Sequence, residues 1–377
     1  MTSGYALDIF GGICDGSCGR ASSVGVVTKT GTIEELAEFL RSLGATEEQL
    51  EVAHREGHLA GLASDLVLAG GAHLSAVDLA ELAGVDVSLV LGLWRTLGVV
   101  VPDDYRPLFS DRDAQFTTLA VRFDLVGSHG DELFRVLGSS LARVAEAAVS
   151  LYVQTVEPQM DSPEVDKVIW AKNEAETTAM ALKLGDAMGA IFAHHMRDAI
   201  DRQRMAQATV PERTLFRLAV GFVDLVGFTP MSQHASSSAV LDLIGAFEAR
   251  AFEVAAAHNG RVVKHIGDEV MFVALDAADA CAIAQDLARA FTEGIEPRGG
   301  VAFGDVITRH GDYYGPVVNL ASRLADLAIP AEVLVDAATA SAARETFGFR
   351  PAGHRLLKGF DTPVEVFSVV TTPADRS

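Results

Sequence analysis

An apolar run that ends at an acidic residue and a glycine turn constrains this chain more than any other feature. Residues 218–229 read LAVGFVDLVGFT, so a β-prone segment reaches Asp224 and then breaks at Gly227. Apolar residues at helical spacing follow, from Val240 to Ala251. A turn that opens a helix presents free N–H groups to an anion, and an Asp beside it can hold a hard cation. The stretch therefore predicts a strand, a turn and a helix around a candidate metal and phosphate site.

A second acidic residue lies in a predicted hairpin. Residues 262–272 read VVKHIGDEVMF, which indicates two short strands joined at Gly267 and Asp268. Two aspartates on turns at the same edge of a sheet are what a pair of Mg²⁺ ions needs. Each motif by itself is also ordinary turn chemistry that requires no ligand.

A third motif makes the set specific. Residues 312–323 read DYYGPVVNLASR, which places Asn319 and Arg323 four residues apart on one face of a predicted helix. In order and spacing, the three motifs resemble the catalytic domain of the class III adenylate/guanylate cyclases. The resemblance covers roughly residues 213–370 and is carried by Asp224, Lys264, Asp268, Asp312, Asn319 and Arg323.

The resemblance implies a site for ATP and two Mg²⁺ or Mn²⁺ ions. It assigns the metal ions to Asp224, Leu225 and Asp268, the purine to Lys264 and Asp312, the phosphates to Phe228, Thr229, Lys358 and Arg309, and the ribose and transition state to Asn319 and Arg323. In this family an acid stands at the Lys264 position of guanylate cyclases, so Lys264 favours adenine. The metal aspartates of one subunit face the Asn and Arg of the other, which implies a head-to-tail homodimer.

The predicted order of elements after the connector is β-α-β-β-α-β with an added α-β-β tail. This is a ferredoxin-like core, so we expect an α+β catalytic domain preceded by helices. The expected activity is conversion of ATP to cyclic AMP and pyrophosphate. The open alternatives are a guanylate or mixed-specificity cyclase and a catalytically silent nucleotide sensor.

The composition of the chain argues against several other classes of protein. With a net charge of −21 over 377 residues, the chain has no overall positive charge to attract nucleic acid or an anionic membrane. A nucleoside triphosphate must therefore be held through metal ions and local cations. The three cysteines are an odd number, which argues against a disulfide framework. The most apolar run, 87–101, contains Arg95 and is too short to span a membrane. We expect a cytoplasmic protein without a transmembrane segment, with a peripheral position at the inner membrane left open.

The first half of the chain has a helical pattern. Thr32 and Glu35 have the spacing of a capping box, and residues 133–156 and 165–208 predict two long helices. The predicted segments are a disordered leader (1–31), an all-α regulatory domain (32–196), a linker or switch segment (197–212) and the catalytic domain (213–377).

The helical domain is similar in placement to those of actinobacterial soluble, pH-responsive adenylate cyclases. The candidate signal to which this domain responds is a proton or a lipid. His194 and His195 are candidates for a pH response, but the favoured alternative is that they are packed or surface histidines without a switching role.

Residues 75–90 also resemble a helix-turn-helix, with Gly84 in the turn. The second helix offers only Arg95 as a cation, which is too little for a recognition helix. We therefore interpret the motif as structural, with DNA binding as the weaker alternative.

Overall fold

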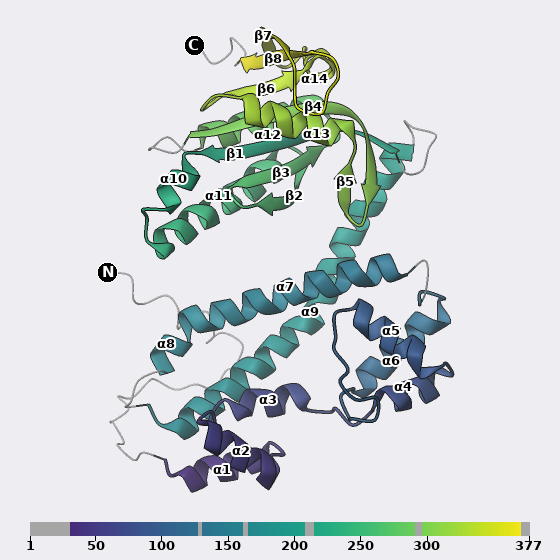
Figure 1. Ribbon diagram of the computed structural model, residues 1–377, viewed down its shortest axis with the longest axis vertical. Helices are drawn as coiled ribbons and strands as arrows, with labels where there is room; N and C mark the ends of the chain where they lie inside the picture. Colours follow the sequence, from purple (N-terminus) through teal and green to yellow (C-terminus); the bar gives the residue numbers. More distant parts are fainter. Residues whose placement is uncertain (1–30, 127–129, 161–164, 208–214, 291–295, 371–377) are drawn as a thin grey trace, which may run out of the picture. The chain divides into compact units, whose positions relative to one another are not determined.

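The computed structural model describes residues 31–126, 130–160, 165–207, 215–290 and 296–370 (Figure 1). The chain divides into two compact units, with the boundary between Ala187 and Met188. The predicted leader, apart from Gly31, lies outside the described residues.

The first unit is helical, as predicted. Its helices are α1 (Ile33–Ser42), α2 (Glu47–Glu56), α3 (Leu62–Ala69), α4 (Ala76–Ala83), α5 (Val87–Thr96), α6 (Asp111–Arg122), α7 (Asp131–Thr155), α8 (Glu157–Met160) and α9 (Lys167–Gln207), which continues past the boundary. The predicted capping box of Thr32 and Glu35 is present. Gly84 ends α4 in the left-handed conformation, as the helix-turn-helix pattern requires.

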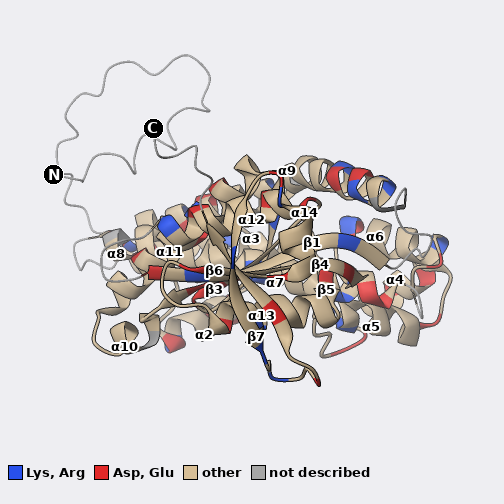
Figure 2. Ribbon diagram, turned by 90° about the horizontal axis from the view of Figure 1, so that it is seen from above, with Lys and Arg blue, Asp and Glu red and all other residues tan. Residues whose placement is uncertain are grey.

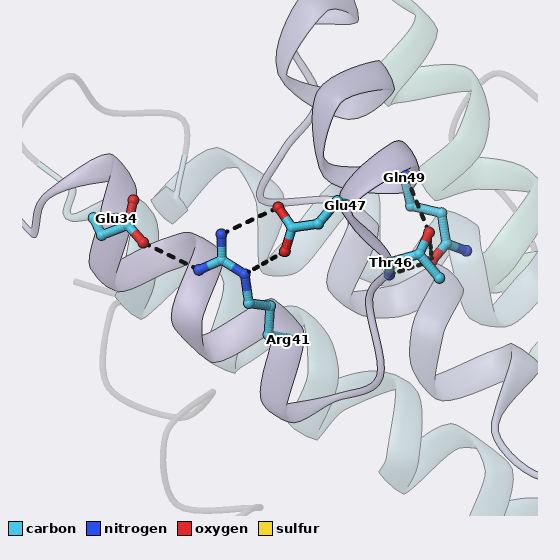
Figure 3. A network of polar contacts seen from close by, with 5 residues as sticks. All are labelled: Glu34, Arg41, Thr46, Glu47 and Gln49. Carbon is cyan, nitrogen blue, oxygen red and sulfur yellow. Dashed lines mark hydrogen bonds and ion pairs between the residues drawn. The ribbon is translucent and has the colours of Figure 1, made fainter.

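A polar network fixes the corner between α1 and α2 (Figure 3). Arg41 donates from Nε to Glu47 at 2.8 Å and from Nη1 to Glu34 at 3.1 Å. Thr46 and Gln49 form the capping box of α2 beside it. The side chains in the ion pairs are exposed to solvent, so the network orients the corner more than it stabilises the unit.

The long helices α7 and α9 expose apolar side chains. Val149 is 61% exposed, and Phe192 is 60% exposed. By length and composition α7 could cross a membrane, the one such helix in the part of the chain that the structure describes. A span was not predicted from the sequence because Arg143 and Glu146 interrupt the apolar residues of α7. One helix of this kind is weak evidence of a membrane span.

The predicted connector is helical where the structure describes it. Residues 197–207 continue α9, and residues 208–212 lie outside the described residues. Figure 2 shows acidic and basic residues interleaved along α9. On this helix Nη1 of Arg204 pairs with Oδ1 of Asp201 at 3.1 Å.

The second unit is the expected α+β domain with a ferredoxin-like core. Its elements are β1 (Leu215–Val226), α10 (Phe228–Ser232), α11 (Ser237–Ala257), β2 (Gly260–Ile266), β3 (Glu269–Ala274), α12 (Ala277–Arg289), β4 (Glu296–Arg309), β5 (Asp312–Tyr314), α13 (Pro316–Leu327), β6 (Val333–Asp336), α14 (Ala337–Ala342), β7 (Gly348–Arg355) and β8 (Val364–Val370). The sheet order is β2-β3-β1-β4-β6-β8-β7, and β5 pairs with β4.

Both faces of this sheet are buried. Alternate residues of β1 point to opposite faces, so Val223 belongs to a core with α11 and α12, whereas Val220 and Phe222 belong to a core with α13. Figure 1 shows α12 and α13 lying along the sheet. The alternation places Asp224 on the same face as α13.

The region after β1 differs from the sequence prediction in one respect. The turn at Gly227 opens the short helix α10 rather than the long helix. Ser236 caps a separate helix, α11, by accepting a hydrogen bond from the N–H of Ala239.

Candidate active site

The two predicted metal aspartates lie on neighbouring segments, one on a strand and one in a turn. Asp224 is near the end of β1, and Asp268 lies in the turn between β2 and β3, where Gly267 has a φ of 66°. The N–H of Leu225 donates to the backbone oxygen of Asp268 at 3.3 Å, which joins the end of β1 to that turn. The fold therefore brings together two acids that are 44 positions apart in the sequence.

Negative charge accumulates where β1 ends beside the turn between β2 and β3. Burial raises the pKa of Asp268, and the charge of Asp224 raises it further. Burial, together with the charges of Asp224, Asp326 and Asp268, raises the pKa of Glu269, which is opposite Asp224 on β3, to about 7. Carboxylates crowded in this way favour a bound cation.

The arrangement fits a divalent metal whose remaining ligands come from elsewhere. Within the described residues no group of three or more His, Cys, Asp or Glu side chains could hold a metal ion. The two predicted carboxylates, with the backbone oxygen of Leu225 that the resemblance adds, are then the candidate donors, and phosphate oxygens of a nucleotide could complete the shell.

The turn after β1 offers backbone groups rather than side chains. Leu225 is 2% exposed, so its side chain cannot meet a ligand. Phe228 packs against the core beneath α11 and α12. Gly227 has a φ of 84°, which allows the chain to reverse into α10. The side chain of Thr229 lies outside the described residues.

The two predicted purine-binding side chains form an ion pair. Nζ of Lys264 on β2 contacts Oδ2 of Asp312, the first residue of β5. Both side chains remain partly accessible. The N–H of Tyr313 donates to the other carboxylate oxygen of Asp312 at 2.8 Å, which orients that group. Arg309 ends β4 opposite Asp312 in the β4–β5 register.

Asn319 and Arg323 lie on α13, as predicted. The helix begins at Pro316, after Gly315 with a φ of 127°. Asn319 is exposed, and Nη1 of Arg323 pairs with Asp326 at 2.8 Å. Lys358 is exposed in the turn between β7 and β8, strands at the opposite edge of the sheet from β2.

Comparison with known proteins identifies the family. Residues 28–200 match the model of the adenylate cyclase regulatory domain, and residues 211–371 match that of the adenylate and guanylate cyclase catalytic domain. An adenylate cyclase of Streptomyces coelicolor is 32% identical over 285 residues, 73% of each chain. The chain belongs to the class III adenylate and guanylate cyclase family.

Two mycobacterial relatives of this cyclase are similar over almost their full lengths. An uncharacterized protein of Mycobacterium tuberculosis is 32% identical over 90% of this chain and 91% of its own. A pH-sensitive adenylate cyclase of the same species is 28% identical over 89% of this chain and 87% of its own.

One residue of the cyclase domain that the sequence analysis did not single out is Arg298. Its guanidinium donates to Oδ2 of Asp224 at 3.0 and 3.2 Å, and it lies opposite Asp224 in the β1–β4 register. Both side chains are mostly buried. In the sequence, the only sign of this contact was a cation directly before the buried run of β4 that starts at Gly299, and the strand register that makes the contact was not readable there.

Proposed function

We propose that this cyclase converts ATP to 3′,5′-cyclic AMP and pyrophosphate at sites shared between two subunits. The observation that carries the proposal is the ion pair of Lys264 and Asp312, which joins two potential purine-reading groups from separate strands. In the same domain a backbone hydrogen bond joins the end of β1, which carries Asp224, to the turn of Asp268. The relative from Streptomyces coelicolor, named an adenylate cyclase, supports the choice of reaction.

The choice of ATP rests on complementary hydrogen bonds. The ammonium of Lys264 donates to a ring nitrogen of adenine, and the carboxylate of Asp312 accepts from the amino group. Guanine has a carbonyl in place of that amino group, so it leaves polar groups mispaired at a cost of about 2–3 kcal/mol.

Turnover of ATP and GTP tests this choice directly. We expect kcat/KM for ATP to exceed that for GTP by roughly 30- to 150-fold. Equal values would indicate a mixed-specificity cyclase. Formation of neither cyclic nucleotide by an enzyme that still binds ATP would indicate a silent sensor.

In the reaction, the ribose 3′-oxygen loses its proton and bonds to the α-phosphorus. The bond from that phosphorus to the oxygen bridging to the β-phosphate breaks, and pyrophosphate leaves with the electron pair. Mg²⁺ or Mn²⁺ held by Asp224, Asp268 and the backbone of Leu225 would lower the pKa of the 3′-hydroxyl and neutralise the phosphates.

The chain's other groups position the substrate and stabilise developing charge. Asn319 orients the ribose, and Arg323 stabilises charge on the α-phosphate, a contribution of about 3–4 kcal/mol in comparable cases. Backbone N–H groups of the turn at residues 225–229 hold phosphate oxygens. Lys358 and Arg309 are proposed to reach the terminal phosphates.

Each site would combine the metal aspartates of one subunit with α13 of its partner in a head-to-tail homodimer. Mixing Asp224→Ala with Asn319→Ala chains tests this, because a mixed dimer retains one intact site. Random exchange at equal amounts should restore about a quarter of wild-type activity, since half of the dimers carry one working site of two. Absence of any recovery, with exchange verified by mass, would contradict the shared site.

We further propose that the helical unit regulates catalysis in response to pH or a lipid, in a protein located in the cytoplasm. The similarity to the pH-sensitive adenylate cyclase of Mycobacterium tuberculosis favours the proton as input.

A further inference from the structure

Arg298 contacts two separate parts of the catalytic unit at once. Its Nε and Nη2 donate to Oδ2 of Asp224 at 3.2 and 3.0 Å. Its Nη1 donates to the backbone oxygens of Asp326 and Ala328 at 2.8 and 3.2 Å. One guanidinium thus holds a candidate metal-binding carboxylate and the carboxyl end of α13.

The strand beneath α13 leaves little freedom in where this helix lies. Residues 298 and 300 point to the same face of β4, the face that α13 covers. A Cβ built on Gly300 would lie 2.2 Å from the nitrogen of Ala325, so the backbones of strand and helix touch at this point. Arg298 then holds the last turn of α13, whose carbonyls lack partners within the helix. A cation is electrostatically favourable there.

We propose that Arg298 is a positioning residue that fixes α13, and with it Asn319 and Arg323, relative to Asp224. The inference rests on the proposed function, in which Asp224 and α13 of one subunit serve different sites of the dimer. Arg323 is tied to the same helix end, because its Nη1 pairs with Oδ2 of Asp326 at 2.8 Å. Within each subunit Arg298 therefore joins one site to the other.

The shape of the guanidinium, and not only its charge, is required for this role. A planar fork can donate to a carboxylate and to helix carbonyls in fixed directions, whereas an ammonium is a single charged point. Arg298→Lys keeps the charge next to Asp224 but loses the two-sided contact. Arg298→Gln loses both.

Hydrogen exchange of the full-length protein, without metal or nucleotide, tests whether Arg298 holds α13 in place. We expect the amides of residues 325–328 to exchange roughly fivefold faster in both variants, as for the loss of one net hydrogen bond. Amides of α12 should be unaffected. Arg350→Gln, at an exposed arginine on β7, is the matched control and should leave α13 unchanged. Unchanged exchange in both variants, or faster exchange in Arg298→Gln alone, would overturn the proposal.

A mixing experiment tests the link between sites. In a mixture of Asp268→Ala and Asn319→Ala chains, the one complete site combines Asp224 of the second chain with α13 of the first. Asp268→Ala is chosen because it leaves the pair of Asp224 and Arg298 intact. Arg298→Gln is then added to either chain.

If Arg298 joins the two sites, both placements should lower the recovered activity by roughly tenfold or more, as expected for misplaced catalytic groups. A loss from one placement alone, or from neither, would overturn the joining role. If the parent mixture recovers nothing, the shared-site function fails instead, and the exchange experiment still decides whether Arg298 holds α13.

Discussion

At Gly300 the sheet and α13 approach so closely that no side chain fits. A Cβ there would lie 2.4 Å from the oxygen of Ala321 as well as 2.2 Å from the nitrogen of Ala325. Gly300→Ala should therefore displace the helix and destabilise the catalytic unit by about 1–3 kcal/mol, measured by urea unfolding.

Gly245 on α11 is the matched control, because a Cβ there would have no atom within 4 Å. Gly245→Ala should be neutral or stabilise by about 0.5–1 kcal/mol, since glycine in a helix is entropically costly. Equal stability of the two variants would show that α13 can move away from β4 at no cost in stability.

The thiol of Cys281 is expected to be inert in the folded protein. It is fully buried on α12, and burial raises its pKa to about 12. Below that pH the folded thiol stays protonated, so a chain with Cys14→Ser and Cys18→Ser should resist maleimide labelling at pH 8. The same chain in denaturant should label completely. Rapid labelling without denaturant would mean that α12 opens from the sheet.

At the scale of elements, the junction of β6 and α14 depends on one carboxylate. Oδ1 of Asp336 accepts from the N–H of Thr339 at 3.0 Å and from its hydroxyl, and both residues are buried. Asp336→Ala should cost about 1–2 kcal/mol in unfolding free energy, because a helix cap is lost and a buried hydroxyl is left without its acceptor. Asp336→Asn keeps an acceptor oxygen and should recover most of the loss. A similar loss in both variants would assign the effect to charge and not to the cap.

Elements with strong local signals were predictable from the sequence. The capping box at Thr32 and Glu35 and the hairpin at Gly267 and Asp268 satisfy backbone groups within a few residues. The break between α10 and α11 was not predicted, because the apolar spacing after Val240 does not reveal where the helix starts. The exposed apolar faces of α7 and α9 were also not predictable, since periodicity does not show what covers a face.

For the whole molecule, the decisive prediction concerns the helical unit. Cyclase activity of residues 210–377 and of the full chain should depend differently on pH, because α9 continues from the helical unit into the catalytic one. Parallel assays from pH 5 to 9 at saturating Mn²⁺ would measure this. Identical profiles would show that the helical unit does not regulate by pH.

The sequence by itself determined which residue types occur in which local setting. Asp224 at a strand end, Asp268 in a tight turn, and Asn319 and Arg323 one helical turn apart follow from patterns shorter than about 15 residues. Those patterns were enough to identify the resemblance and the ferredoxin-like core; the family comparison confirms the first, and the observed order of elements confirms the second.

Only the tertiary structure decided which distant residues meet. The pairing of Lys264 with Asp312 and of Asp224 with Arg298 depends on strand order and register. Register is set by packing against both faces of the sheet, because a shift of one residue would turn every buried side chain of a strand to the wrong face. Local patterns carry no information about that choice, and for this reason Arg298 became visible only in the folded chain.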